Sequence, residues 1–313
     1  MAERHDIEFT SGSGAVLRGW SYPAGDGAPC VVVQHGFAAV KEMHLDDYAE
    51  VFQAAGLSCL VYDHPGFGAS DAVPGQPRQE IDPWVQVRHI QEAITYAASL
   101  DHVDGDRIGL WGSSYGAANA YVTAAIDRRV KAVVGQVPLI SGSRAFASLV
   151  RIDLWDQMDA LFAADRQARM AGQPPMTIPV VDPDPMAQSA LPTADSHAFF
   201  TQTAAERAPS FVNEVTARTL EMFRGYEPGA YLPLIAPTPL LMVLAPRDRL
   251  VAGEWSTAAY ETAAHPKRIE LLDGGHFDAY TGEGFARSST AARDWFVEHL
   301  IEHPNRGTIT QGT

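Results

Sequence analysis

The chain has 313 residues, 46% of them hydrophobic, so it can bury a large core as one domain with an insertion. It contains 23 Lys and Arg and 38 Asp and Glu, and the formal net charge of -15 makes nucleic acids and anionic membrane surfaces poor partners. We find no signal peptide, no apolar run of about 20 residues and no metal-ligand spacing of Cys and His. We therefore expect a cytoplasmic protein without metal or cofactor, and the sequence leaves open whether it forms a homodimer.

Strand-like and helix-like segments alternate up to about residue 136, which predicts a mostly parallel sheet with helices on both faces. The expected strands are residues 7–9, 15–22, 31–35, 58–62, 107–111, 130–136, 239–244 and 268–272. The expected helices are residues 43–55, 82–99 and 117–125, the second with Asp82 as N-cap and Pro83 at its first position. Cys30 and Cys59 fall in apolar runs and are expected to be buried free thiols.

The alternation stops between about residues 139 and 233. Apolar residues recur at helical spacing over 145–170 and again over 199–223, with a proline-rich stretch between them. We expect this insertion to form a cap over the carboxyl ends of the strands, and an ordinary packing subdomain is the alternative. The expected parts are a core of residues 1–139 and 234–304, a helical cap of residues 140–233 and a disordered tail of residues 305–313.

Gly112-Ser-Ser-Tyr-Gly116 is the most informative motif, because an apolar strand runs into it and a small-residue helix runs out. This is a G-x-S-x-G pattern in the setting of a nucleophile elbow, which predicts Ser114 as a nucleophile in a strained turn. A Cβ at either flanking glycine would collide with the neighbouring strand or helix. The alternative is that Ser114 is an ordinary helix N-cap, since serine is favoured there.

Two later strands end just before residues that suit this serine. Asp248 follows one strand, and His276 follows the next through a glycine-rich turn. The order Ser, Asp, His, each just past a strand, is the α/β-hydrolase order. Asp248 also suits a turn, but no carboxylate follows the strand 130–136, where some hydrolases of this fold place theirs. Asp273 and Asp278 are the next candidates for the acid, and of the 11 histidines only His276 lies in such a turn.

Acyl transfer needs these side-chain types. His276 would take the proton of Ser114 and return it to the leaving group, while Asp248 would fix the imidazole tautomer. The backbone amides of Phe37 and Tyr115 would stabilise the oxyanion, each worth on the order of 3 kcal/mol. The substrate would be a small-molecule acyl compound.

Other residues near these motifs have structural or binding interpretations. His35 is expected to pack beneath the oxyanion turn, and Ser113 to point away from the elbow with its hydroxyl bonded. The apolar stretch of the insertion predicts Trp155, Met158 and Phe162 as lining of the acyl pocket. If that stretch is core packing, the pocket is set by Tyr115, Phe37 and the loop after Gln136.

These motifs resemble α/β-hydrolases related to the Xaa-Pro dipeptidyl-peptidase catalytic domain. They are most similar to the branch of dienelactone-hydrolase-like esterases and polyketide thiohydrolases or transferases. The resemblance covers about residues 17–140 and 240–300 and is carried by His35-Gly-Phe-Ala-Ala-Val-Lys-Glu-Met43, Tyr62-Asp-His-Pro-Gly-Phe-Gly-Ala-Ser-Asp71, Glu80-Ile-Asp-Pro-Trp84, Asp106-Arg-Ile-Gly-Leu-Trp-Gly-Ser-Ser-Tyr115 and Val130-Lys-Ala-Val-Val-Gly-Gln-Val-Pro-Leu-Ile-Ser141. By position it implies the same nucleophile, acid, base and oxyanion amides.

Two departures narrow what the resemblance implies. The chain lacks the C-terminal jelly-roll domain of the dipeptidyl peptidases, so peptidase activity is not expected. Its elbow continues with Gly116-Ala-Ala-Asn, whereas the proteins it resembles continue with a second serine and glycines. We expect a serine hydrolase acting on a carboxylic ester, thioester or lactone. An acyltransferase or polyketide-releasing thiohydrolase with the same triad is one alternative, and a non-catalytic binding protein of this fold is the other. Dehalogenases and epoxide hydrolases are excluded, because they place a carboxylate where this chain has Ser114.

Overall fold

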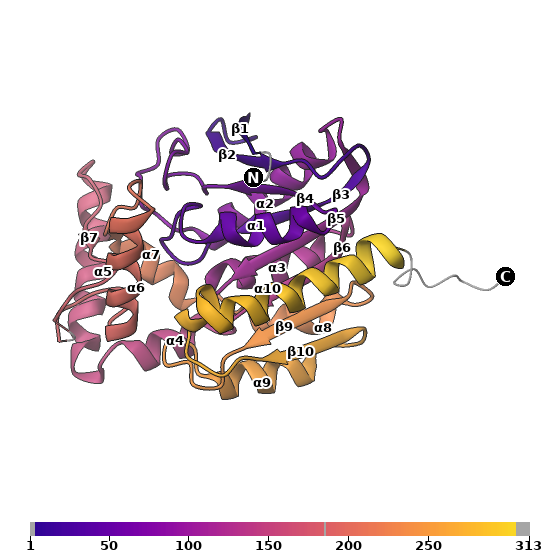
Figure 1. The fold of residues 1–313 in the computed structure, drawn as a ribbon. Coiled ribbons are helices and arrows are strands. Elements are labelled where there is room, and N and C mark those ends of the chain that lie inside the picture. Colours follow the sequence, from indigo (N-terminus) through magenta and orange to yellow (C-terminus); the bar gives the residue numbers. More distant parts are fainter. Residues whose placement is uncertain (1–3, 185, 305–313) are drawn as a thin grey trace.

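The computed structural model describes residues 4–184 and 186–304, and the predicted disordered tail, residues 305–313, lies outside this range (Figure 1). The strands are β1 (His5–Thr10), β2 (Val16–Tyr22), β3 (Ala28–Gln34), β4 (Ser58–Tyr62), β5 (Val103–Ser113), β6 (Val130–Gln136), β7 (Thr177–Ile178), β8 (Val215–Thr216), β9 (Leu240–Leu244) and β10 (Lys267–Leu271). The α-helices are α1 (Leu45–Ala54), α2 (Pro83–Ala98), α3 (Tyr115–Ile126), α4 (Gly142–Leu149), α5 (Trp155–Met170), α6 (Ala194–Glu206), α7 (Ala217–Arg224), α8 (Leu232–Ile235), α9 (Gly253–Thr262) and α10 (Gly282–Phe296). Short helical turns are η1 (Ile152–Leu154), η2 (Pro228–Tyr231), η3 (Phe277–Tyr280) and the π-helical η4 (Val297–Glu302).

Eight strands form one sheet in the order β1-β2-β4-β3-β5-β6-β9-β10. β2 is antiparallel to both of its neighbours, β1 and β4, and every further pair in this sheet is parallel. Gln34 pairs with Gly112, and Ser113 pairs with Gln136, so the carboxyl ends of β3, β5 and β6 reach the same edge. The predicted α/β fold with a mostly parallel sheet is confirmed.

Helices cover both faces of the sheet. α1 and α10 lie side by side over one face, and α2, α3, α8 and α9 pack against the other (Figure 1). Because successive strand residues point to opposite faces, Trp111 of β5 packs with α1 and α10, whereas Leu110 packs with α2 and α3. Cys30 and Cys59 are buried free thiols, as predicted, and they belong to the clusters on opposite faces.

The start of α2 follows the local sequence signals. The Asp82 carboxylate accepts hydrogen bonds from the backbone N–H groups of Trp84 and Val85 at 3.0 and 3.2 Å. Pro83 occupies the first helical position, where its missing N–H leaves no acceptor unpaired. The predicted cap is confirmed.

The insertion is more finely divided than helical spacing predicted. The first helical stretch stops at Leu149 and restarts at Trp155, because Val150 adopts an extended backbone conformation. The Trp155 indole N–H donates to the freed Val150 carbonyl at 3.1 Å, so the break leaves that acceptor satisfied.

The second helical stretch of the insertion is also broken. α6 ends at Glu206 and α7 begins at Ala217, because Pro209 cannot continue a helix. α7 starts afresh with Thr216 as N-cap, whose hydroxyl accepts from the Thr219 N–H.

Helices α4 to α7 lie together at one end of the molecule (Figure 1). Their buried side chains join Phe37 and Tyr115 in one apolar cluster, so the insertion adjoins the carboxyl edge of the sheet. The division into a core and a separate cap, with residues 140–233 as the cap, remains a prediction.

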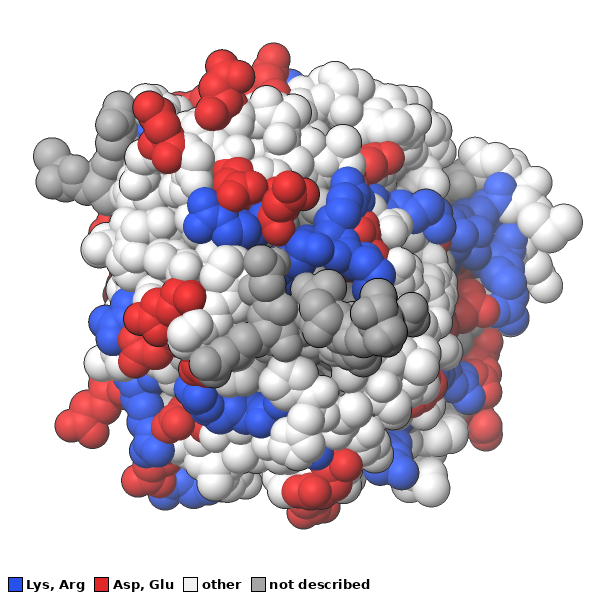
Figure 2. Space-filling model, turned by 90° about the vertical axis from the view of Figure 1, so that its right-hand side faces the viewer, with Lys and Arg blue, Asp and Glu red and all other residues white. Residues whose placement is uncertain are grey.

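Charged side chains of both signs are mixed on the surface. Figure 2 shows one face, on which groups of Lys and Arg lie beside Asp and Glu, separated by uncharged areas. In the part of the chain that the structure describes, no helix is long and apolar enough to cross a membrane.

Candidate active site

Ser114 lies at a sharp turn between β5 and α3. Its backbone has φ 57° and ψ -118°, a conformation that residues other than glycine rarely adopt. A Cβ at Gly112 would lie 2.3 Å from the Gly116 carbonyl oxygen, and one at Gly116 would lie 2.5 Å from the His35 carbonyl oxygen. The turn therefore requires both glycines, as predicted. The Ser114 hydroxyl caps no amide of α3, which removes the interpretation of this residue as an ordinary N-cap.

The end of β6 and the loop after it hold the Ser114 backbone from both sides. The Ser114 N–H donates to the Gln136 carbonyl at 2.8 Å, and the Leu139 N–H donates to the Ser114 carbonyl at 3.1 Å. The neighbouring Ser113 hydroxyl is buried and accepts a hydrogen bond from the Tyr280 hydroxyl at 2.6 Å. Ser113 thus has the structural role expected of it, and the strained backbone of Ser114 is fixed independently of its side chain.

His276 and Asp248 meet in a buried hydrogen bond. The distance from Nδ1 of His276 to Oδ2 of Asp248 is 2.7 Å, and the two side chains are 2% and 3% exposed. The other carboxylate oxygen accepts from the N–H groups of Leu250 and Val251, each at 2.8 Å. Since the carboxylate can only accept hydrogen bonds, it holds the imidazole proton on Nδ1 and leaves a free lone pair on Nε2.

The two other candidate carboxylates are engaged elsewhere. Asp273 is 91% exposed and pairs with Arg247. Asp278 accepts from the Gly275 N–H at 2.7 Å and so closes the glycine turn before His276. Neither takes the place of Asp248 at the imidazole.

His35 orients the peptide unit that carries the Phe37 amide. The His64 N–H donates to Nε2 of His35 at 3.0 Å, so the ring proton lies on Nδ1 and donates to the Gly36 carbonyl at 3.0 Å. In a trans peptide the N–H points opposite to the C=O, so this bond directs the Phe37 N–H away from His35. Burial lowers the pKa of His35, which keeps the ring neutral for this role.

The second predicted oxyanion donor is the Tyr115 amide. Tyr115 is the first residue of α3, so its N–H has no acceptor within the helix. Within the described residues no backbone or side-chain acceptor engages the amides of Phe37 or Tyr115. Both amides remain the predicted oxyanion donors.

A buried ion pair behind the turn after β3 was not found from the sequence. The Asp63 carboxylate accepts from both the backbone N–H and the ammonium of Lys41, each at 2.7 Å, and from the Ala69 N–H at 3.0 Å. These bonds tie the turn after β3 to the turn after β4. The only signal available was a carboxylate directly after an apolar strand, which predicts a turn as readily as an ion pair.

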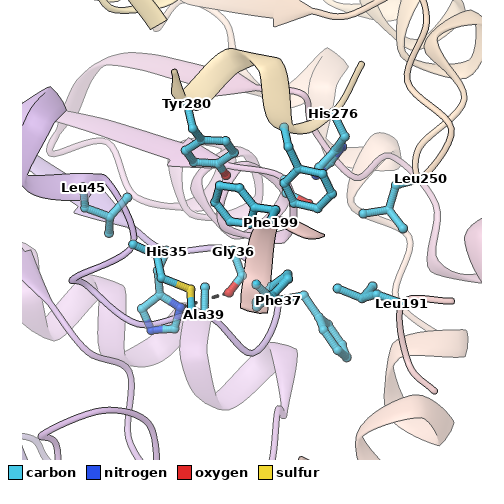
Figure 3. Close-up of a pocket in the computed structure, with 14 residues that line it drawn as sticks. His35, Gly36, Phe37, Ala39, Leu45, Leu191, Phe199, Leu250, His276 and Tyr280 are labelled. Carbon is cyan, nitrogen blue, oxygen red and sulfur yellow. Dashed lines mark hydrogen bonds between the residues drawn. The ribbon is translucent and has the colours of Figure 1, made fainter. Parts of the chain in front are cut away.

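Two cavities meet at Ser114, and we name each after a residue found in only one of them. The His276 chamber (Figure 3) is lined by His35, Gly36, Phe37, Ala39, Met43, Leu45, Ser114, Leu191, Phe199, Phe200, Leu250, His276, Phe277 and Tyr280. The Tyr115 chamber is lined by Phe37, Ser114, Tyr115, Leu139, Ala145, Leu149, Ala190, Leu191, Leu220, Phe223, Leu250 and Val251. The predicted nucleophile thus opens on two largely apolar spaces.

The predicted pocket residues Trp155, Met158 and Phe162 line neither chamber, and their part in binding an acyl chain remains a prediction. Their helix, α5, packs behind α4: the rings of Trp155 and Phe162 lie 5.9 and 6.3 Å from that of Phe146. Side chains of α4 and α7, such as Leu149, face the Tyr115 chamber instead. The alternative lining is present, because Tyr115, Phe37 and the loop after β6 all reach this chamber.

Helix α6 supplies a wall that the sequence did not reveal. Phe199 and Phe200 line the His276 chamber, and the Phe199 ring stacks on that of Phe277 at 4.5 Å. The two adjacent phenylalanines were visible in the sequence, but nothing there indicated which of the apolar residues of the insertion face a cavity.

Comparison with known proteins agrees with this geometry. Residues 30–288 match the model of the alpha/beta hydrolase family. The chain is 32% identical to the polyketide transferase grgF of Penicillium sp. over 90% of this chain and 92% of that protein, and 28% identical to a thiohydrolase of Eupenicillium brefeldianum over 91% of each. The crystal structure of the alpha/beta hydrolase GrgF from Penicillium sp. superposes with a TM-score of 0.81 at 30% identity, covering 95% of this chain and 99% of that one. The predicted resemblance to the thiohydrolase and transferase branch is confirmed, and the chain belongs to the alpha/beta hydrolase family.

Proposed function

We propose that this protein is a serine hydrolase that cleaves a carboxylic ester, thioester or lactone through an acyl-enzyme. Ser114 is the nucleophile, His276 the general base and Asp248 the acid that orients the base. The observation that carries this proposal is the buried 2.7 Å bond between His276 and Asp248, with His276 lining the same cavity as Ser114, a serine with positive φ. A strained serine, an imidazole and a carboxylate at one place are what nucleophilic catalysis needs, and packing alone does not require them.

In the first half-reaction, Oγ of Ser114 attacks the carbonyl carbon while Nε2 of His276 takes the hydroxyl proton. The imidazolium is stabilised by Asp248, whose second oxygen stays bonded to two backbone amides throughout. The carbon–leaving-group bond then breaks as His276 passes the proton to the leaving atom. Ser114 is left esterified by the acyl group.

The amides of Phe37 and Tyr115 stabilise the charge that develops on the carbonyl oxygen. Their position is set before the substrate arrives, one by the His35 bond to Gly36 and the other by the start of α3. Donors fixed in this way cost no reorganisation at the transition state, and each is worth about 3 kcal/mol.

The second half-reaction decides between hydrolysis and acyl transfer. Water releases an acid, whereas an alcohol, amine or thiol in the same position gives a new ester, amide or thioester. Relatives named thiohydrolase and polyketide transferase favour keeping the transfer reaction as the second candidate. Adding candidate acceptors to a hydrolysis assay and identifying the products separates the two.

The proposal is tested with a fluorophosphonate probe and two neighbouring serine variants. Wild type is expected to react at Ser114 and to lose ester hydrolysis in parallel. Ser114→Ala should remove both labelling and turnover with an unchanged melting temperature. Ser113→Ala is the matched control and should still be labelled, because its hydroxyl faces Tyr280 and not the chambers. Turnover that survives Ser114→Ala contradicts the proposal, and a wild type that is never labelled supports a non-catalytic binding protein.

A further inference from the structure

The two chambers differ in which part of the proposed machinery they contain. Ser114 and Phe37 line both chambers, His276 lines only the first, and Tyr115 lines only the second. A substrate carbonyl at Ser114 therefore has two distinct spaces available for its two substituents.

Proton transfer decides which substituent enters which space. The leaving atom must come within hydrogen-bond reach of Nε2 of His276, about 3 Å, to receive its proton. The group attached to that atom consequently lies on the side of His276. The acyl chain leaves the carbonyl carbon in the other direction, toward Tyr115.

We infer that the Tyr115 chamber binds the acyl chain, and that the His276 chamber binds first the leaving group and then an uncharged, apolar alcohol or thiol as acceptor. This inference rests on the proposed function. It assigns acyl specificity to α4 and α7, and leaving-group and acceptor specificity to α6, α1 and η3.

The lining of the His276 chamber supports an apolar acceptor. Aromatic rings of Phe199, Phe200, Phe277 and Tyr280 surround it, and no Lys, Arg, Asp or Glu is among its lining residues. Tyr280 offers little polarity, because its hydroxyl already donates to Ser113. A charged group here would lose its hydration without gaining a charged partner, which is unfavourable.

The walls of the two chambers are held in place separately. Arg207, at the end of α6, donates to both carboxylate oxygens of Asp46 at 2.6 Å and to Asp47 at 2.7 Å, which fastens α6 to α1. Leu149 and Leu220 of the Tyr115 chamber come from α4 and α7, which pack on one another. A change to one wall is therefore expected to leave the other in place.

In acyl transfer the bonds balance without any further reactant. The acceptor R–OH or R–SH gives its proton to His276 as its oxygen or sulfur bonds to the acyl carbon. The bond from that carbon to Oγ of Ser114 then breaks, and His276 returns the proton to Oγ. Both half-reactions use the same chamber for the group that carries the proton, so leaving-group and acceptor preferences should change together.

The test measures kcat/KM for two series of esters with alkanol leaving groups. One series joins butyrate to ethanol, butanol or hexanol, and the other joins ethanol to acetate, butyrate or octanoate. Phe199→Ala should change the hexyl-to-ethyl preference by at least roughly tenfold and the octanoate-to-acetate preference by less than about threefold. Leu149→Ala should do the reverse. Leu161→Ala, on α5 outside both chambers and half-buried like the other two, is the control and should shift neither.

A shift of the acyl series by Phe199→Ala, a shift of the alcohol series by Leu149→Ala, or no shift by either overturns the inference. A crystal structure of wild type modified by octanesulfonyl fluoride gives a second test that needs no variant. The octyl chain mimics an acyl chain and should lie in the Tyr115 chamber, and a chain in the His276 chamber refutes the assignment. These outcomes leave Ser114 as the nucleophile, so failure of the inference is distinguishable from failure of the proposed function.

Discussion

Replacing Asp248 by asparagine should nearly abolish turnover while leaving the fold intact. Oδ1 of Asp248 accepts from two backbone N–H groups, of Leu250 and Val251, each at 2.8 Å. In Asp248→Asn the amide oxygen must keep facing these two donors, because turning the NH2 group toward them would place donor against donor. The NH2 group is then directed at Nδ1 of His276.

An amide N–H donating to Nδ1 requires the imidazole proton to sit on Nε2. Nε2 then has no lone pair to take the proton of Ser114, and the imidazolium loses its counter-charge. The expected loss in kcat is about 10⁴-fold, which corresponds to roughly 5 kcal/mol of transition-state stabilisation. The variant is nearly isosteric, so KM and the melting temperature should change little.

Steady-state kinetics with a p-nitrophenyl ester and a thermal melt of the same sample measure both expectations. His276→Ala is the companion variant and should lose at least as much kcat, since the base acts directly. A loss of less than tenfold in Asp248→Asn, with a folded protein, would refute the assignment of the acid. Asp278 and Asp273 would then be the next variants to measure.

Three further outcomes are expected. His35→Phe removes the donor to the Gly36 carbonyl, so the Phe37 amide loses its fixed direction. We expect kcat to fall roughly tenfold to a hundredfold at nearly constant KM. A rise in KM of that size with kcat unchanged would contradict this. Burial lowers the pKa of His64, and neither of its ring nitrogens has a hydrogen-bond partner among the described residues. Below about pH 6.5 this histidine therefore binds a proton in the unfolded chain but not in the folded protein. The free energy of unfolding should consequently fall by up to about 1.4 kcal/mol for each pH unit below that value. His64→Leu should reduce that slope between about pH 6 and pH 5 in urea titrations, and an unchanged slope would rule out this histidine as its source. EDTA should leave kcat unchanged, because the proposed mechanism uses no metal, and a loss that zinc restores would count against it.

Features that depend on local geometry could be predicted from the sequence. The elbow at Ser114 requires glycines on both sides because its turn brings them against backbone atoms, and the N-cap at Asp82 is settled within three residues. Asp248 and His276 could be placed together because the carboxyl ends of parallel strands share one edge of the sheet. The structure shows them joined by a hydrogen bond of 2.7 Å.

Features that depend on how helices face one another could not be predicted. Helical spacing identified Trp155, Met158 and Phe162 as an apolar face, but such a face packs equally well on a cavity or on another helix, and here it packs behind α4. The ion pair of Lys41 with Asp63 joins residues 22 positions apart through two turns whose shapes the sequence does not specify. For the same reason, the division of the site into two chambers could not be predicted from the sequence.

Trapping the acyl-enzyme tests the central claim most directly. Wild type mixed with excess p-nitrophenyl butyrate and quenched in acid within milliseconds should gain the mass of one butyryl group. Peptide mapping should place that group on Ser114, and Ser114→Ala should gain no mass under the same conditions. His276→Ala should accumulate the adduct far more slowly than wild type, because the serine has lost its base. A butyryl group on any other residue, or ester turnover without a covalent adduct on Ser114, would contradict the account.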